Sequence, residues 1–247
     1  MIQPVISLIV TRCEQVSDEL LGRYSDLMSD EERQRNERYH FAIDRRRDLI
    51  ARALLRTQLA ERLSTQPQSL LFTRGEHGKP ALVGNDQVAA NVQFNLSHAG
   101  DWVVLALASM RVGIDIEYTS RDNDVMAIAD RYFFGQEINE LKSFNKSDQV
   151  QRFFDYWTLK EAYMKARGEG ISLGLNNFGF SVIDKQNISI KMKPCLNDNP
   201  SDWQFLLTSP NPDYRLALAI NSGVKPLLQC YECVPFGSIK PLEGIDL

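Results

Sequence analysis

The segment Trp157–Lys165, with the sequence Trp-Thr-Leu-Lys-Glu-Ala-Tyr-Met-Lys, constrains this chain more than any other stretch. Phe154 and Trp157 begin an aromatic stripe at helical spacing, and Glu161 and Lys165 continue it. A carboxylate in such a stripe needs a partner, because burying an ionised group alone is costly. A salt bridge to the lysine one turn later could supply the partner, at only about 0.2–0.5 kcal/mol. The alternative is a bound cation.

A second acidic pattern lies in Gly113–Glu117, with the sequence Gly-Ile-Asp-Ile-Glu. The alternation predicts a strand whose isoleucines face a core while Asp115 and Glu117 face the other way, although an ordinary half-exposed strand would look similar. Together with Glu161, these residues place three carboxylates on two rigid elements. Carboxylate oxygens suit Mg²⁺, whose remaining ligands are usually substrate phosphates. We therefore expect metal-assisted chemistry on a phosphate ester or anhydride.

The charge balance of the 247-residue chain does not indicate non-specific nucleic-acid binding, because 28 basic and 32 acidic residues give a net charge of −4. No window approaches the ~18 apolar residues of a membrane span. The N-terminus lacks the basic lead and cleavage site of a signal peptide, so we expect a cytoplasmic chain. The four cysteines are expected to be reduced packing residues, because neither a second Cys-x-x-Cys pair nor a nearby histidine completes a metal site.

Arginines are concentrated between residues 33 and 62. Most are expected to lie on solvated helix faces beside neighbouring acids. The run Arg45-Arg46-Arg47 is different, because it opens a predicted helix, where the helix dipole disfavours cations. This placement suggests that an anionic ligand approaches the start of the helix.

The apolar runs predict the α+β class, with helices mixed among largely antiparallel strands. The runs at 102–108 and 112–117 are expected to form a hairpin, with Asn95–Gly100 as a turn before it. The break between them would divide the chain into an N-terminal half, 1–110, and a C-terminal half, 111–247. Expected helices are 44–63, 124–142 and 148–167, with one or two more within 17–39; further expected strands are 2–10, 178–183, 188–192, 203–208, 214–220 and 227–234.

Two loop segments offer groups that could contact phosphate. Ser97 and His98 are adjacent, but a Ser–His nucleophilic pair is disfavoured because neighbouring residues rarely orient for proton transfer. A phosphate contact from both side chains is the favoured hypothesis. Lys79 offers another cation in Gly-Lys-Pro. Taken alone, each of these residues would be unremarkable in a loop.

Four segments occur together and in this order: Gly78–Pro80, Asn95–Gly100, Gly113–Glu117 and Trp157–Lys165. In this combination the chain resembles the 4′-phosphopantetheinyl transferases, and within them the Sfp-type, surfactin-synthetase-activating group, over roughly residues 25 to 183. The resemblance implies two similar α+β halves, related by a pseudo-twofold axis and packed together in one chain, with coenzyme A between them. It implies Mg²⁺-dependent transfer of the 4′-phosphopantetheine arm from coenzyme A to a serine of an apo acyl or peptidyl carrier protein. Adenosine 3′,5′-bisphosphate would be released, and a self-contained site implies a monomer.

The resemblance also implies roles for individual residues. Asp115, Glu117 and Glu161 would hold Mg²⁺, or Mn²⁺, against the coenzyme A pyrophosphate, with Lys165 beside it. Asp115, Glu161 and Lys165 would be the catalytic residues. Glu161 is the expected base for the acceptor serine, directly or through water, and Glu137 is its rival. The implied contacts to the nucleotide and its phosphates are Arg35, Arg47, Lys79, Ser97, His98 and Lys165.

Two other functions remain open on the sequence. A Mg²⁺-dependent phosphohydrolase acting on a nucleotide diphosphate could use the same acidic residues. A coenzyme A-binding module without catalysis is the other, although the intact Asp115, Glu161 and Lys165 argue against it. For the transferase, the stretch 118–134, with Arg121 and Met126, is the expected docking surface for the carrier protein.

Overall fold

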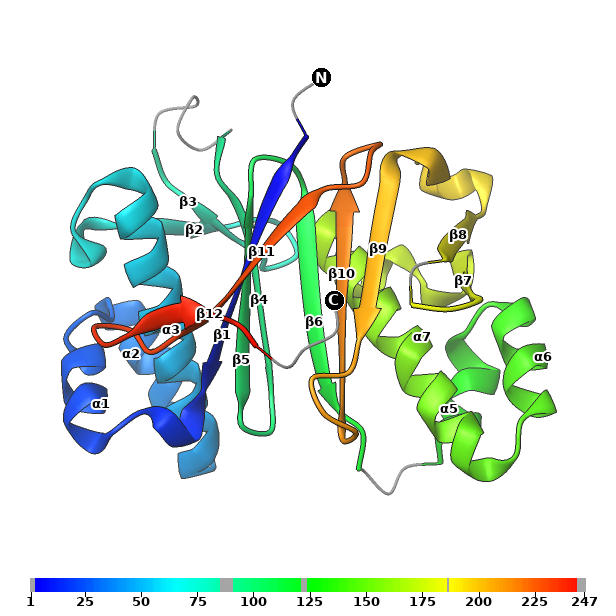
Figure 1. The fold of residues 1–247 in the computed structure, drawn as a ribbon, viewed down its shortest axis with the longest axis horizontal. Helices are drawn as coiled ribbons and strands as arrows, with labels where there is room; N and C mark the ends of the chain where they lie inside the picture. The colour runs from blue at the N-terminus through cyan, green and yellow to red at the C-terminus, as the bar shows by residue number, and fades with distance from the viewer. Residues whose placement is uncertain (1–2, 85–90, 121–123, 186, 244–247) are drawn as a thin grey trace.

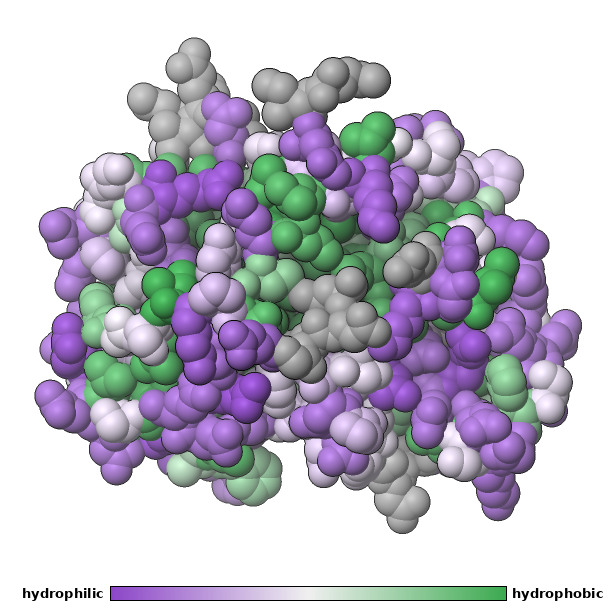
Figure 2. Space-filling model, viewed as in Figure 1, coloured by the Kyte–Doolittle hydropathy of each residue, from purple (hydrophilic) through white to green (hydrophobic). Residues whose placement is uncertain are grey.

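The computed structural model describes residues 3–84, 91–120, 124–185 and 187–243. Two β-sheets meet in the middle of the molecule, and the helices cover their outer sides, as Figure 1 shows. The mixed α+β class is confirmed by this arrangement. In Figure 2, apolar side chains gather near the centre of the view, where the two sheets meet, and hydrophilic ones cover most of the two flanks.

The first sheet has five strands in the order β12-β11-β1-β5-β4. Its strand β5 is buried at every position, as its uninterrupted apolar sequence predicts. One face packs against α3, where Ile50 and Leu54 meet Leu105 of β5 in a common core. The strands are β1 (Val5–Arg12), β4 (Gln93–Ala99), β5 (Trp102–Ala108), β11 (Leu227–Cys233) and β12 (Ile239–Pro241); the helices on this side are α1 (Asp18–Ser25), α2 (Asp30–Glu37) and α3 (Ala42–Leu63).

The second sheet has three strands in the order β6-β10-β9, all antiparallel. The long helix α7 packs on it, and Phe154 and Tyr163 of this helix join an aromatic core with Phe178 and Trp203. The strands are β6 (Val112–Tyr118), β9 (Trp203–Thr208) and β10 (Tyr214–Asn221); the helices are α5 (Val125–Tyr132), α6 (Gly135–Ser143) and α7 (Lys146–Arg167). Two small antiparallel pairs flank the sheets: β2 (Phe72–Arg74) with β3 (Pro80–Leu82), and β7 (Phe178–Val182) with β8 (Ile188–Met192). Single 3₁₀ turns lie at Cys13–Gln15, Pro67–Ser69, Gly170–Leu173, Leu175–Asn177, Pro194–Leu196 and Pro200–Asp202.

Three local expectations were wrong. The single helix predicted over 124–142 is two helices, α5 and α6, separated at Phe133 and Phe134. The predicted hairpin between 102–108 and 112–117 does not form, because β5 already pairs with β1 on one edge and β4 on the other. Strand β6 therefore pairs with β10 in the second sheet. The segment predicted as a turn, Asn95–Gly100, lies mostly in β4, and the turn begins only at Gly100.

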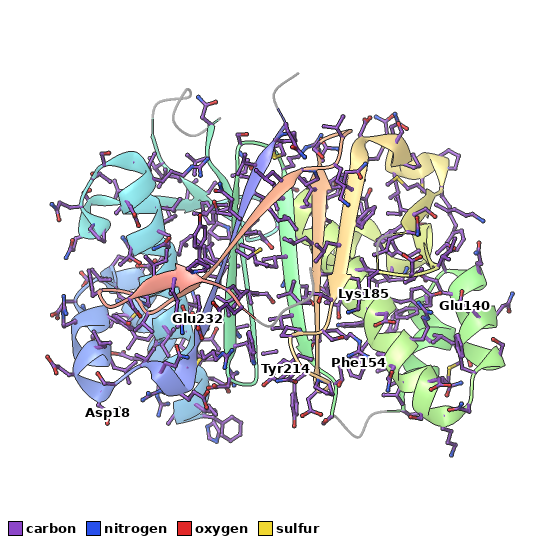
Figure 3. The ribbon with its side chains drawn as sticks, in the orientation of Figure 1. Asp18, Glu140, Phe154, Lys185, Tyr214 and Glu232 are labelled. Atoms are coloured by element: carbon purple, nitrogen blue, oxygen red, sulfur yellow. The ribbon has the colours of Figure 1, made fainter. Side chains whose placement is uncertain are left out.

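The C-terminal segment returns to the first sheet, where β11 lies parallel to β1. On β11, the Glu232 carboxylate forms ion pairs with Arg12 of β1 at 3.2 Å and with Lys240 of β12 at 2.9 Å. Figure 3 shows Glu232 on the side of the first sheet, away from Tyr214 of the second sheet and Phe154 of α7. The first sheet is thus built from segments near both ends of the chain. Among the described residues, no helix is both long and apolar enough to cross a membrane.

Candidate active site

A cavity of about 360 Å³ lies where β4, β6 and α7 come together. Strand β6 and helix α7 supply its acidic residues, and β4 supplies its hydroxyl and imidazole groups. Six of the lining residues carry polar or charged side chains that the sequence had singled out: Ser97, His98, Asp115, Glu117, Glu161 and Lys165.

The helix can approach the strand this closely because residue 113 is a glycine. A Cβ at Gly113 would overlap the carbonyl oxygen of Ala162 and the amide nitrogen of Ala166 on α7. The next position on the same face of the strand is Asp115, and α7 presents Lys165 to it. The small residue of the Gly-Ile-Asp pattern thus sets the distance at which the charged side chains meet.

The centre of the cavity is an ion pair between the two elements. Lys165 Nζ lies 2.6 Å from Asp115 Oδ1, and Asp115 is only 4% exposed. The Ser97 hydroxyl donates to the same carboxylate oxygen at 2.8 Å and accepts from Lys165 Nζ at 2.9 Å. It also accepts from the Ile116 amide at 3.4 Å. A serine hydroxyl has one proton and two lone pairs, so Ser97 has its full set of partners here.

The other two carboxylates differ in their surroundings. The Trp157 indole nitrogen donates to Glu117 Oε1 at 3.1 Å. Burial, together with the negative charges of Asp115 and Glu117, raises the pKa of Glu161 to about 7, although Lys165 acts in the opposite direction. Burial first, and repulsion from the two neighbouring carboxylates second, thus favour a protonated Glu161 near neutral pH in the absence of metal.

A divalent cation would relieve that repulsion, and one donor atom is free to bind it. Asp115 Oδ2 is buried and has no hydrogen-bond partner in the structure. Across the described ranges, no three His, Cys, Asp or Glu side chains converge into a ready-made metal site. In this cavity, Lys165 binds the other oxygen of Asp115. The donor set is all oxygen, which fits Mg²⁺ or Mn²⁺ better than a softer metal.

Two of the predicted phosphate contacts are Arg47, near the start of α3, and His98, on β4. Burial and the charges of Arg47 and Lys165 lower the pKa of His98, so its imidazole is held in the neutral form. Arg47 Nε donates to the Gly100 carbonyl at 2.8 Å, and its guanidinium also bonds Asp44 at 3.0 Å. Arg45, by contrast, donates to the Tyr39 carbonyl at 2.7 Å. The arginine run predicted to meet an anion is thus partly used to fix the chain's own loops.

Two further predicted contacts lie outside the 360 Å³ cavity. Lys79 Nζ donates to the carbonyls of Lys165 at 2.7 Å and Ala166 at 3.3 Å, at the C-terminal end of α7, where the helix dipole favours a cation. Burial lowers the pKa of Lys79 to about 8. Arg35 pairs with Glu31 at 3.1 Å and lines a separate cavity of about 710 Å³.

The rival base, Glu137, is fully buried, with 0% exposure. One of its oxygens lies 2.8 Å from Lys160 Nζ and accepts from the Phe134 amide, and the other accepts from the Phe180 amide. It is absent from the residues that line the catalytic cavity. Its geometry suits a structural ion pair rather than proton exchange with a substrate.

Two further residues take part in the site without having been predicted from the sequence. Trp157 was assigned to the aromatic stripe, yet its indole N–H orients Glu117; its place one turn before Glu161 could have signalled this. Asn95 was assigned to a turn, but its side chain accepts from the Ile114 amide of β6 at 2.8 Å. No local pattern could have indicated that contact, because it joins two sheets.

Comparison with known proteins agrees with the geometry. Residues 111–219 match the family profile described as the 4′-phosphopantetheinyl transferase superfamily, and residues 16–110 match that of the N-terminal region of a 4′-phosphopantetheinyl transferase. Similar proteins include the 4′-phosphopantetheinyl transferase HetI of Nostoc sp., 36% identical over 208 residues that cover 84% of both chains.

Two more relatives extend the likeness. A putative 4′-phosphopantetheinyl transferase of Synechocystis sp. is 37% identical over 69% of this chain and 67% of its own. The 4′-phosphopantetheinyl transferase Sfp of Bacillus subtilis is 29% identical over 82% of this chain and 86% of its own. The chain therefore belongs to the 4′-phosphopantetheinyl transferase superfamily and is an enzyme that transfers phosphopantetheine to carrier proteins.

Proposed function

We propose that this enzyme uses coenzyme A and a divalent cation, Mg²⁺ or Mn²⁺, to modify a serine of an apo acyl or peptidyl carrier protein. The observation that carries this proposal is the cavity in which Asp115, Glu117, Glu161 and Lys165 meet. It combines oxygen ligands, a free buried carboxylate oxygen and a cation for phosphate. Adenosine 3′,5′-bisphosphate is the second product.

Asp115, Glu117 and Glu161 would hold the cation, which when bound neutralises the diphosphate and polarises its phosphorus. Lys165 is placed to neutralise charge on the departing bisphosphate. Glu161 accepts the proton of the carrier serine. At the same time the serine oxygen bonds to phosphorus, and the bridging phosphorus–oxygen bond of the diphosphate breaks. Such transfers depend mainly on positioning and charge stabilisation, so the rigid strand and helix are suitable supports.

Glu161 is a better candidate base than Glu137 because it lines the cavity beside Asp115 and Lys165. Glu137 has no exposed surface and no access to the cavity. A carboxylate bound to a metal is a weak base, so a water molecule held by Glu161 is an equivalent route for the proton.

We further propose that the protein is a monomer whose two similar halves meet at residues 110 and 111, with β11 and β12 of the C-terminal segment completing the sheet of the first half. The two family profiles, which end and begin at these residues, support that boundary.

We also propose that the carrier protein docks on the stretch 118–134. Within it, Met126 and Ile128 pack partly against the core of the second half, Arg131 is on α5, and Arg121 lies outside the described residues.

The test is incubation of the enzyme with coenzyme A, Mg²⁺ and an apo carrier protein, followed by mass spectrometry of the carrier. We expect a gain of one phosphopantetheine, and loss of that gain with EDTA. Asp115→Asn and Glu161→Gln should each slow transfer by about a hundredfold or more. Asp18→Asn is the matched control, because Asp18 lies on the outer helix α1, as Figure 3 shows. Full activity in both cavity variants would refute the site.

The same experiment separates the alternatives. A phosphohydrolase would release product from coenzyme A without any carrier protein. A binding module would retain coenzyme A without turnover and would bind it equally well after Glu161→Ala.

A further inference from the structure

The two sheets are joined at the catalytic cavity by side chains rather than by a strand ladder. In an antiparallel pair, alternate backbone amides of a strand point away from its partner. Strand β6 pairs with β10 on one edge, and its Ile114 and Ile116 amides point to the other, toward β4. Within the described part of the chain, no backbone ladder joins β4 to β6.

Two residues of β4 satisfy these amides. Asn95 Oδ1 accepts from the Ile114 amide at 2.8 Å, in a buried position. Ser97, two residues later on the same face, accepts from the Ile116 amide at 3.4 Å. The two acceptors therefore hold the backbone on both sides of Asp115, the residue between the two amides.

We propose that Asn95 is a positioning residue for phosphopantetheinyl transfer. It makes the shorter of the two bonds, so it fixes the register of β6 against β4. That register decides whether the Ser97 hydroxyl reaches Asp115 and Lys165, at 2.8 and 2.9 Å. Asn95 lines no part of the catalytic cavity and acts through Ser97. The inference rests on the proposed roles of Asp115 and Lys165.

The test is a double-mutant cycle on turnover. Asn95→Ala should lower kcat by about tenfold to a hundredfold, as the loss of an orienting partner typically does, and leave the KM for coenzyme A within about twofold. In a Ser97→Ala background the same change should cost much less, because the side chain that Asn95 positions is already absent. Independent, multiplicative losses would overturn the proposal, as would an unchanged kcat in folded Asn95→Ala.

A rescue variant and a control sharpen the result. Asn95→Ser should retain most of kcat, because Ser97 demonstrates that a hydroxyl on this face can accept from β6. Gln93→Ala removes another amide from the same face of β4 and should leave kcat unchanged. Folding is checked by circular dichroism at the assay temperature. If Asn95→Ala is unfolded, Asn95→Leu, which keeps the volume without an acceptor, takes its place. Unfolding of both would assign the bond to the fold alone and refute a positioning role.

Asp115→Asn, measured in parallel, distinguishes a failure of the proposed active site from a failure of the positioning role of Asn95. If it keeps full kcat, the proposed site fails. If it loses kcat while Asn95→Ala does not, only the positioning role fails.

Discussion

The Lys165 ammonium lies 2.6 Å from Asp115 Oδ1, which joins the last turns of α7 to the middle of β6. The pair leaves the second oxygen of Asp115 buried and without a hydrogen-bond partner. Glu161 lies in the same cavity, where burial and the charges of Asp115 and Glu117 raise its pKa to about 7. The cavity is therefore short of positive charge, and its properties should respond to pH and to metal.

Without metal, Glu161 should make stability depend on pH. Its pKa is raised from 4.5 to about 7 in the folded state, so the protonated form is favoured there. The contribution of Glu161 to the free energy of unfolding is fully present below pH 4.5. It is lost as the pH rises through 7, by up to about 3 kcal/mol. Urea unfolding of EDTA-treated protein should thus give Glu161→Gln a growing advantage over wild type between pH 5 and 8. A constant difference between the two proteins would contradict the raised pKa.

Glu137→Gln should separate stability from catalysis. Breaking the fully buried pair with Lys160 is expected to cost about 3–5 kcal/mol of unfolding free energy. The kcat per folded molecule should stay near wild type, because Glu137 does not reach the cavity. Urea unfolding measures the loss of stability. Initial rates divided by the concentration of folded enzyme measure kcat. A loss of kcat as large as that of Glu161→Gln would make Glu137 the base.

Trp157→Phe should weaken the binding of Mg²⁺. The change keeps a ring to stack on Phe133 and Phe153 but removes the N–H bond to Glu117. We expect the Mg²⁺ concentration for half-maximal activity to rise about tenfold, as for other outer-sphere partners. Trp203→Phe is the matched control, because it also loses one indole bond, to Asp198, and neither residue lines the cavity. Equal shifts in both variants would indicate a general loss of packing.

Gly113→Ala should push α7 away from β6. The added methyl group meets helix backbone rather than a flexible side chain, so we expect a loss of about 1–3 kcal/mol in unfolding free energy. Transfer should fall too, since the ion pair would be separated. Gly22→Ala is the control, because a Cβ added at Gly22 on α1 would meet no atom within 4 Å. It should be neutral or stabilising by about 0.5–1 kcal/mol. Wild-type stability in Gly113→Ala would mean that the helix and strand are less closely packed.

Arg47→Ala should raise the KM for coenzyme A more than it lowers kcat, because the residue offers charge for binding rather than chemistry. Arg45→Ala is the control two residues earlier, since that guanidinium bonds the Tyr39 carbonyl. Initial rates over a range of coenzyme A concentrations distinguish the two. A lower kcat with unchanged KM for Arg47→Ala would contradict a binding role.

The sequence by itself determined the local structure and the chemistry of this protein. Helical spacing placed Glu161 and Lys165 on one face of α7, and alternation placed Asp115 and Glu117 on one face of β6, because side-chain direction follows from backbone geometry alone. The order of the motifs was enough to identify the family. Even so, the strand that contains Ser97 looked like a turn, because its polar residues face another sheet rather than solvent.

The tertiary structure alone decided which strands pair and which polar groups meet. It paired β6 with β10 instead of β5, returned β11 to the first sheet, placed Lys79 on the end of α7 and buried Glu137 against Lys160. Periodicity specifies the face of an element but not its neighbour. Neighbours are chosen by contacts between residues distant in the chain, whose energies depend on the assembled core.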